Sequence, residues 1–170
     1  MKKFILGAIL LFSVLGFSQN LKKLDEKNGF RQYKFGMSVD SIPNLKLIET
    51  SKNGFSKYYD KTDEVKKIGD FNVDRIVYGF YKDKLDIVMI YIKSYGNSKG
   101  ILGVFETQYG KGYQANRYME DYTWFGKTIT LSYDENSLTN DSKIFIYTNQ
   151  FTSEKAEDKK ISEEKAKNEI

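Results

Sequence analysis

The chain contains neither cysteine nor histidine. Without cysteine it can form no disulfide and has no thiolate nucleophile. Without histidine it lacks the usual proton shuttle near neutral pH and the most common zinc ligand. These absences exclude histidine-based catalytic triads, cysteine enzymes and histidine-ligated zinc. Carboxylate chemistry, lysine chemistry and calcium sites made of oxygen atoms are not excluded.

Arginine is also scarce, although the chain is basic. The 27 basic residues include only Arg31, Arg75 and Arg117, and the formal net charge of +4 includes Lys2 and Lys3. Proteins that bind nucleic acid use arginine for bidentate contacts with bases and phosphates. We therefore expect no nucleic-acid partner and take the positive charge as weak support for any anionic ligand.

The N-terminus has the three parts of a secretory signal peptide. Lys2 and Lys3 precede an apolar run over residues 4–15, and Gly16 and Ser18 then supply small side chains before a cleavage site. The run is too short to span a bilayer core of about 30 Å, which argues against an uncleaved membrane anchor. We predict cleavage after Ser18 and a periplasmic or secreted product without stable membrane insertion. Because no cysteine follows, we expect this product to be released rather than lipid-anchored.

The rest of the chain divides into three parts by composition. Residues 19–29 are polar and predict a flexible lead-in. Residues 30–150 carry nearly all the large apolar side chains and predict a single domain. Residues 151–170 are crowded with charges of both signs and predict a solvated helix or a disordered tail.

Two β-hairpins and one helix are predicted within the domain. Strands at 71–81 and 85–92 form the first hairpin, since both are rich in β-branched and aromatic residues. A second hairpin spans 123–148, with Phe125 and Leu131 on one face of its first strand and Trp124 on the other.

The predicted helix lies between the hairpins. It begins near Asn97 or Ser98, presents Ile101 and Phe105 on one face, and ends at Gly110. One helix on such strands predicts an α+β fold with two layers and a mainly antiparallel sheet.

Two pairs of adjacent acidic residues are candidates for catalytic groups. Glu120 and Asp121 form one pair, and Asp134 and Glu135 form the other. A glycosidase places two carboxyl groups about 5–10 Å apart across a cleft, and nothing in the sequence sets that spacing. The loop at 134–141 is rich in oxygen ligands but lacks the glycine and the final glutamate of an EF-hand loop. We therefore predict neither a catalytic residue, nor a metal site, nor a cofactor.

A cluster of aromatic residues after the helix is the candidate binding site. Aromatic faces beside a guanidinium can stack on sugar rings or hold a peptide. The alternative is that some of these side chains pack back over the sheet. The candidate ligand-binding residues are Tyr113, Arg117, Tyr118, Tyr122 and Trp124.

Two segments resemble a known group of exported proteins. The segment Phe-Gly-Met-Ser-Val-Asp-Ser-Ile at 35–42 resembles the helix start of small proteins with the β-lactamase-inhibitor-protein-like fold. That group includes the small outer-membrane lipoprotein of the barrel-assembly machinery. The order of residues 105–111, Trp124 and then 128–133 is similar to the pattern of helix, Tyr-Gly, loop, tryptophan and strand in many exported bacterial proteins. The resemblance implies an exported α+β domain and assigns no functional residue.

These observations predict a non-enzymatic binding or interaction protein of the bacterial envelope, whose ligand is a protein or a glycan. An inhibitor or immunity-like protein that blocks an exported enzyme through the concave face of the sheet is the alternative. A hydrolase that uses carboxylates is a third and weaker hypothesis.

Overall fold

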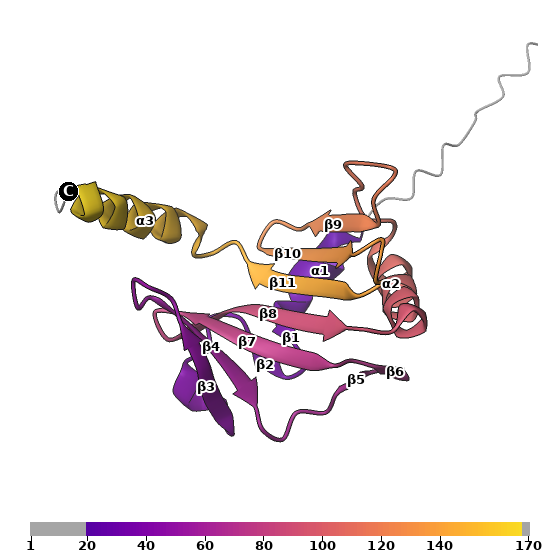
Figure 1. Cartoon of the computed structure of the whole chain (residues 1–170), viewed down its shortest axis with the longest axis horizontal. Coiled ribbons are helices and arrows are strands. Elements are labelled where there is room, and N and C mark those ends of the chain that lie inside the picture. Colours follow the sequence, from indigo (N-terminus) through magenta and orange to yellow (C-terminus); the bar gives the residue numbers. More distant parts are fainter. Residues whose placement is uncertain (1–19, 168–170) are drawn as a thin grey trace, which may run out of the picture.

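The protein is built around one sheet of seven strands (Figure 1). The computed structural model describes residues 20–167, so the predicted signal peptide at 1–18 lies outside the described residues. Every neighbouring pair of strands in this sheet is antiparallel. The strands, in spatial order, are β3 (Leu45–Thr50), β4 (Ser56–Lys61), β7 (Arg75–Tyr81), β8 (Lys84–Ile92), β11 (Ser142–Thr148), β10 (Ile129–Glu135) and β9 (Asp121–Phe125).

Helices and short strands lie around this sheet and confirm the predicted α+β fold. The helices are α1 (Leu21–Lys27), the 3₁₀ turn η1 (Val39–Ser41), α2 (Tyr95–Tyr109) and α3 (Thr152–Lys167). The short antiparallel pairs are β1 (Gly29–Phe30) with β2 (Tyr33–Lys34), and β5 (Lys67–Ile68) with β6 (Phe71–Asn72). Among residues 20–167, no helix combines the length and the apolar character needed to cross a membrane.

The first predicted hairpin is formed by β7 and β8. Lys82 and Asp83 join the strands, and both have positive φ angles, 46° and 60°, as a two-residue type I′ turn requires. The strand predicted over 71–81 is, however, interrupted. Its first two residues form β6, and β7 starts only at Arg75; Val73, between the two strands, is buried in the core.

The second predicted hairpin is a three-stranded unit. A turn after Phe125 separates β9 from β10, and the register places Trp124 opposite Leu131. Trp124 therefore faces the core, whereas Phe125 is 56% exposed. The sequence pattern placed Phe125 on the same face as Leu131 and Trp124 on the other face. It was wrong for these residues, because the turn after Phe125 interrupts the alternation.

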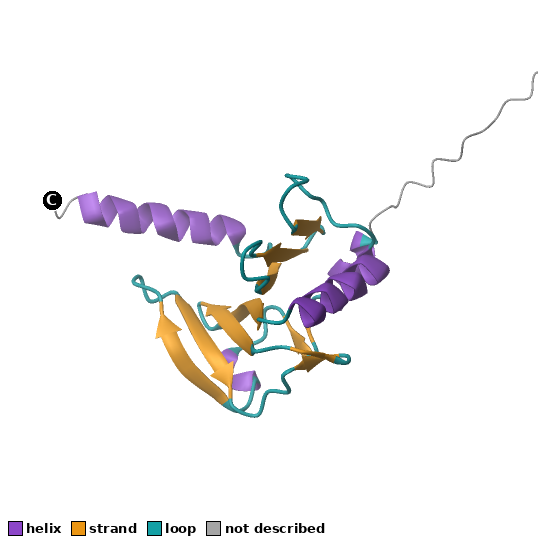
Figure 2. Ribbon diagram, turned by 45° about the vertical axis from the view of Figure 1, so that its right-hand side comes forward, coloured by secondary structure: helices purple, strands orange, loops and turns teal. Residues whose placement is uncertain are grey.

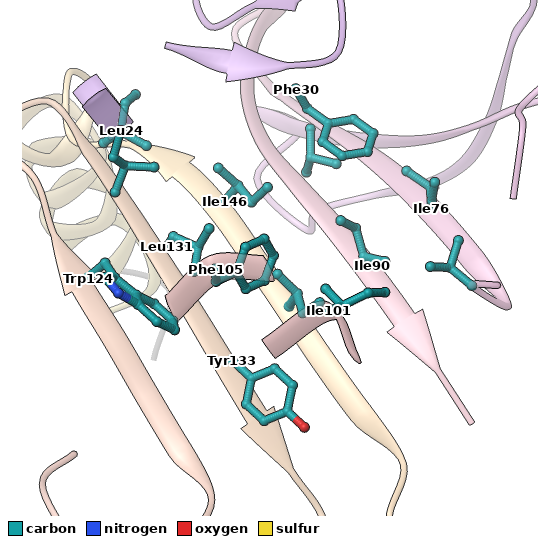
Figure 3. Packing of buried hydrophobic residues seen from close by; sticks show 14 of the residues in the cluster. Leu24, Phe30, Ile76, Ile90, Ile101, Phe105, Trp124, Leu131, Tyr133 and Ile146 are labelled. Atoms are coloured by element: carbon teal, nitrogen blue, oxygen red, sulfur yellow. The ribbon is translucent and has the colours of Figure 1, made fainter. Parts of the chain in front are cut away.

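The core lies between one face of the sheet and the helices α1 and α2 (Figure 3). The ring of Phe105 packs edge-on against Trp124, with ring centroids 5.9 Å apart. Ile101 and Phe105 were predicted to face the sheet, and both are buried. The helix starts at Tyr95, before the predicted cap, and Ser98 is instead fully buried inside it.

The N-terminal segment is not the flexible lead-in that its polar composition predicts. Residues 21–27 form α1, whose Leu24 is 2% exposed and belongs to the core. The side chain of Asn20 accepts a hydrogen bond from the backbone of Lys23 and caps the helix. Only one side chain of this helix is buried, so the sequence carries no periodic signal for it.

Candidate functional site

Two of the five predicted binding residues belong to the core. Trp124 is completely buried, and its Nε1–H donates a hydrogen bond to the carbonyl oxygen of Gly110 at 2.7 Å. Tyr122 is 9% exposed, and its ring lies beside that of Tyr133. Both follow the inward parity of β9, opposite Leu131 and Tyr133 of β10. The prediction that they bind a ligand at the surface was therefore wrong.

The other three residues are exposed and take part in two different sets of contacts. The guanidinium of Arg117 lies 4.8 Å from the ring centroid of Tyr118 and donates to its hydroxyl at 2.5 Å. Tyr113 pairs with Thr123 in an antiparallel bridge, and its ring lies 6.1 Å from that of Phe125. Tyr113 thus belongs to the edge of the main sheet, whereas Arg117 and Tyr118 lie in the loop beyond it.

The face of the sheet opposite α1 and α2 is the strongest candidate for a binding surface. In Figure 1, α1 lies behind β10 and β11, so the viewer sees this opposite face. α3 contacts it at one end, at Tyr81 and Asp86. We call this surface the open face. Because strand side chains alternate, the observed register defines the rows of residues that cross it.

Two neighbouring rows form the apolar centre of the open face. The first crosses five strands and the second crosses six, and most of their side chains are partly exposed. The first apolar row consists of Val77, Met89, Phe145, Ser132, Thr123 and Tyr113. The second apolar row consists of Tyr58, Gly79, Ile87, Tyr147, Thr130 and Phe125.

Gly79 lets the aromatic ring of Tyr58 lie close to the sheet. A Cβ atom on Gly79 would lie 2.4 Å from Cγ2 of Ile87 and 3.1 Å from two ring atoms of Tyr58. Tyr58 and Ile87 therefore fill the space above this glycine, an arrangement known from aromatic residues that cover sheet glycines. This close packing fixes the position of the Tyr58 ring in the second apolar row.

A shallow hollow lies where the two apolar rows meet β3 and β4. Its volume is about 280 Å³, and Val77 and Met89 contribute to its apolar lining. Arg75 borders it and is held by Asp60 through two hydrogen bonds of 2.9 and 2.8 Å. This bidentate pair fixes the orientation of the guanidinium at the border of the hollow.

A third row, the charged row, runs beside the first apolar row. It consists of Arg75, Tyr91, Lys143, Asp134 and Asp121. Asp121 and Asp134 lie directly opposite each other on β9 and β10. Burial, and then the charge of Asp134, raise the pKa of Asp121. The charged row therefore has a basic half on β7 and β11 and an acidic half on β10 and β9.

The register groups the acidic residues differently from the sequence, because each contact joins a residue of one predicted pair to a residue of the other. Glu120 and Glu135 both contact the ammonium group of Lys99, at 2.8 and 3.2 Å. Tyr133 and Ser98 donate hydrogen bonds to the buried carboxylate of Glu135. This network satisfies Glu135 inside the protein, so it has a structural rather than a catalytic arrangement. Within residues 20–167, no group of three or more acidic side chains is placed to hold a metal ion.

A larger hollow of about 620 Å³ lies near β2 and β4, but its central groups are already paired. Arg31 pairs with Glu64 and donates to the backbone carbonyls of Val65 and Lys67. Glu64 also accepts a hydrogen bond from the Tyr78 hydroxyl at 2.7 Å. These contacts tie together the loops that line the hollow, so its charged groups already serve the fold.

The open face combines an apolar centre with a charged border, which is the usual composition of a protein–protein interface. Tyrosine, phenylalanine and methionine, the residues enriched in such interfaces, all occur in its two apolar rows. Comparison of the chain with protein-family models, curated proteins and solved structures finds no match.

Proposed function

We propose that the protein is an exported, non-enzymatic binding protein whose open face binds a protein of the bacterial envelope. The observation that carries this proposal is the pair of apolar rows, where Met89, Phe145 and Tyr147 remain partly exposed. Soluble proteins rarely expose a large contiguous apolar patch unless it binds something. The signal peptide predicted from the sequence supports the location.

The charged row favours a protein ligand over a glycan. Lys143 lies on its basic half, and Asp134 and Asp121 lie on its acidic half. A complementary ligand must therefore present charges of both signs beside an apolar surface. A folded protein has this combination, whereas a neutral glycan has neither the charges nor the aliphatic groups that Met89 would contact.

Inhibition of an exported enzyme is the second candidate function. It is supported by the sequence resemblance to the β-lactamase-inhibitor-protein-like group and by helices that leave one face of the sheet uncovered. Both candidate functions use the open face. They differ in whether the bound protein is an enzyme that loses turnover in the complex.

Site-specific photo-crosslinking tests the proposed surface. A photoreactive amino acid at Phe145, in the first apolar row, should form an adduct with one envelope protein. The same group at Thr107, which is exposed on α2, should not form it. Equal amounts of adduct at both positions would contradict the proposal. An adduct at Phe145 that contains polysaccharide and no protein would also contradict it.

The identified protein should then be purified and titrated against Met89→Lys. A charge in the centre of the first apolar row should weaken binding at least tenfold, since it places an unpaired ammonium group in the interface. Thr107→Lys adds the same charge to the opposite side of the molecule and should leave affinity unchanged. Loss of affinity in both variants, or in neither, would argue against the open face.

A further inference from the structure

The helix α3 has two halves with different surroundings. In the first half, Lys82 of the β7–β8 turn lies 2.7 Å from Glu154 and 2.8 Å from Asp158. Lys155 pairs with Asp86 of β8. Residues 159–167 are all exposed, and the ion pair between Lys159 and Glu163 lies within the helix itself. Figures 1 and 2 both show α3 running outward beyond the end of β11.

Charges, rather than apolar contacts, dominate the docking of the first half. The ring of Phe151, just before α3, lies 5.8 Å from that of Tyr81. No residue of α3 itself is buried, and its Ile161 is 45% exposed. The pair between Lys82 and Glu154 is partly exposed on both sides, whereas the carboxylates of Asp158 and Asp86 are largely buried in their pairs. Partly exposed ion pairs contribute modestly to stability and are weakened by salt. The docked position of α3 is therefore held largely by ion pairs, which high ionic strength weakens.

The docked half covers one end of the open face. Tyr81 follows Gly79 on β7 with the same outward parity, and Asp86 precedes Ile87 on β8. They are only 3% and 4% exposed. The Tyr81 hydroxyl donates to Asp158, and one carboxylate oxygen of Asp86 pairs with Lys155 while its Oδ1 has no hydrogen-bond partner. Release of α3 would expose both side chains beside the second apolar row.

We propose that α3 is a reversible arm, held by charge, that closes one end of the open face and enlarges this face when it is released. The arm's effect on ligand binding rests on the proposed function, whereas its movement is a property of the chain alone. A ligand that contacts Tyr81 and Asp86 competes with α3 for them. It therefore binds the released form more tightly than the docked form.

Distance measurements between two spin labels test the movement. The chain has no cysteine, so labels can be attached to cysteines introduced at Thr107 on α2 and Ser162 in the outer half of α3. At low salt we expect one narrow distance distribution. At about 1 M salt, where the screening length falls to about 3 Å, we expect a broad one.

Two matched variants separate the docking contacts from general charge effects. Glu154→Gln with Asp158→Asn removes the two carboxylates that face Lys82. Glu163→Gln with Glu164→Gln makes the same change of charge in the outer half. The first variant should show the broad distribution already at low salt, and the second should keep the narrow one.

Two results would overturn the proposal that α3 is a reversible arm. One is a narrow distribution that persists in the first variant and at high salt, and the other is a broad distribution for the unmodified chain at low salt. These measurements need no ligand. A mobile arm in a chain that forms no adduct at Phe145 would refute the proposed function alone, and a fixed arm beside a bound partner would refute the arm alone.

Discussion

Asp25 and Thr128 are 103 residues apart in the sequence and directly bonded in the fold. Oδ1 of Asp25 accepts hydrogen bonds from the backbone N–H of Thr128 at 2.9 Å and from its hydroxyl at 3.0 Å. The same carboxylate accepts hydrogen bonds from the backbone of Lys127 and Ile129. A single side chain of α1 thus satisfies three successive backbone N–H groups at the turn between β9 and β10 and fixes the helix to the sheet.

Replacing Asp25 with alanine should destabilise the protein by about 1–3 kcal/mol. The variant leaves several backbone N–H groups without an acceptor, including the partly buried one of Ile129. Urea denaturation would measure the change in the free energy of unfolding. Glu26→Ala is the control, because the ion pair of Glu26 with Lys22 is exposed, and it should cost less than about 0.5 kcal/mol. Equal costs for the two variants would contradict the role of Asp25.

The contribution of Asp25 should depend on pH. Burial alone would raise the pKa of its carboxyl, but the hydrogen bonds from Thr128, Lys127 and Ile129 together lower it below the usual value of 3.8. A lowered pKa stabilises the folded state above the unfolded-state pKa, and this stabilisation is lost as the pH falls through the folded-state pKa. The difference in unfolding free energy between the unmodified chain and Asp25→Ala should therefore be constant near neutrality and shrink below about pH 3.8. A difference that grows on acidification would show the opposite sign.

The single tryptophan, Trp124, reports directly on whether its segment is core or surface. It is fully buried against Phe105, so its emission should lie at short wavelength and resist quenching by acrylamide. Trp124→Phe should cost about 1–3 kcal/mol, because the carbonyl of Gly110 loses its donor. Emission at the wavelength of free tryptophan in the folded protein would place this side chain at the surface instead.

The strands that the sequence predicts well are those with a local signal. The β7–β8 hairpin follows from β-branched runs on both sides of a short charged turn, and Gly110 ends α2 as expected. In contrast, β3 lies at the edge of the sheet with Leu47 and Ile48 exposed, so its sequence shows no buried face. The helix α1 is held by the contact between Asp25 and Thr128, which are 103 residues apart. No local sequence pattern reveals such a contact.

The candidate site was missed because it depends on register. Val77 and Met89 lie on the β7–β8 hairpin, but Phe145 lies on β11, which α2, β9 and β10 separate from it in the sequence. Each looks like an ordinary strand residue. The cluster near Tyr118 was conspicuous because its aromatic residues are neighbours in the sequence. Trp124 faces the core because the turn after Phe125 places it opposite Leu131. The alternation of side chains along β8 and β11 is a signal for this surface. It can be used only when the pairing of the two strands is known.

Two glycines of α2 should respond in opposite ways to alanine. Alanine is favoured over glycine inside a helix by about 1 kcal/mol. A Cβ atom on Gly103 would meet nothing within 4 Å, so Gly103→Ala should stabilise the protein by about that amount. A Cβ atom on Gly100 would lie 2.0 Å from the ring of Phe71, which packs against the core.

Gly100→Ala must therefore displace the Phe71 ring, and overpacking of this kind costs about 1–3 kcal/mol. This cost should exceed the gain in helix propensity and lower the free energy of unfolding. Chemical denaturation of both variants measures the contrast within one helix. If Gly100→Ala were as stabilising as Gly103→Ala, the ring of Phe71 would not lie against α2, and the contact between β6 and this helix would be refuted.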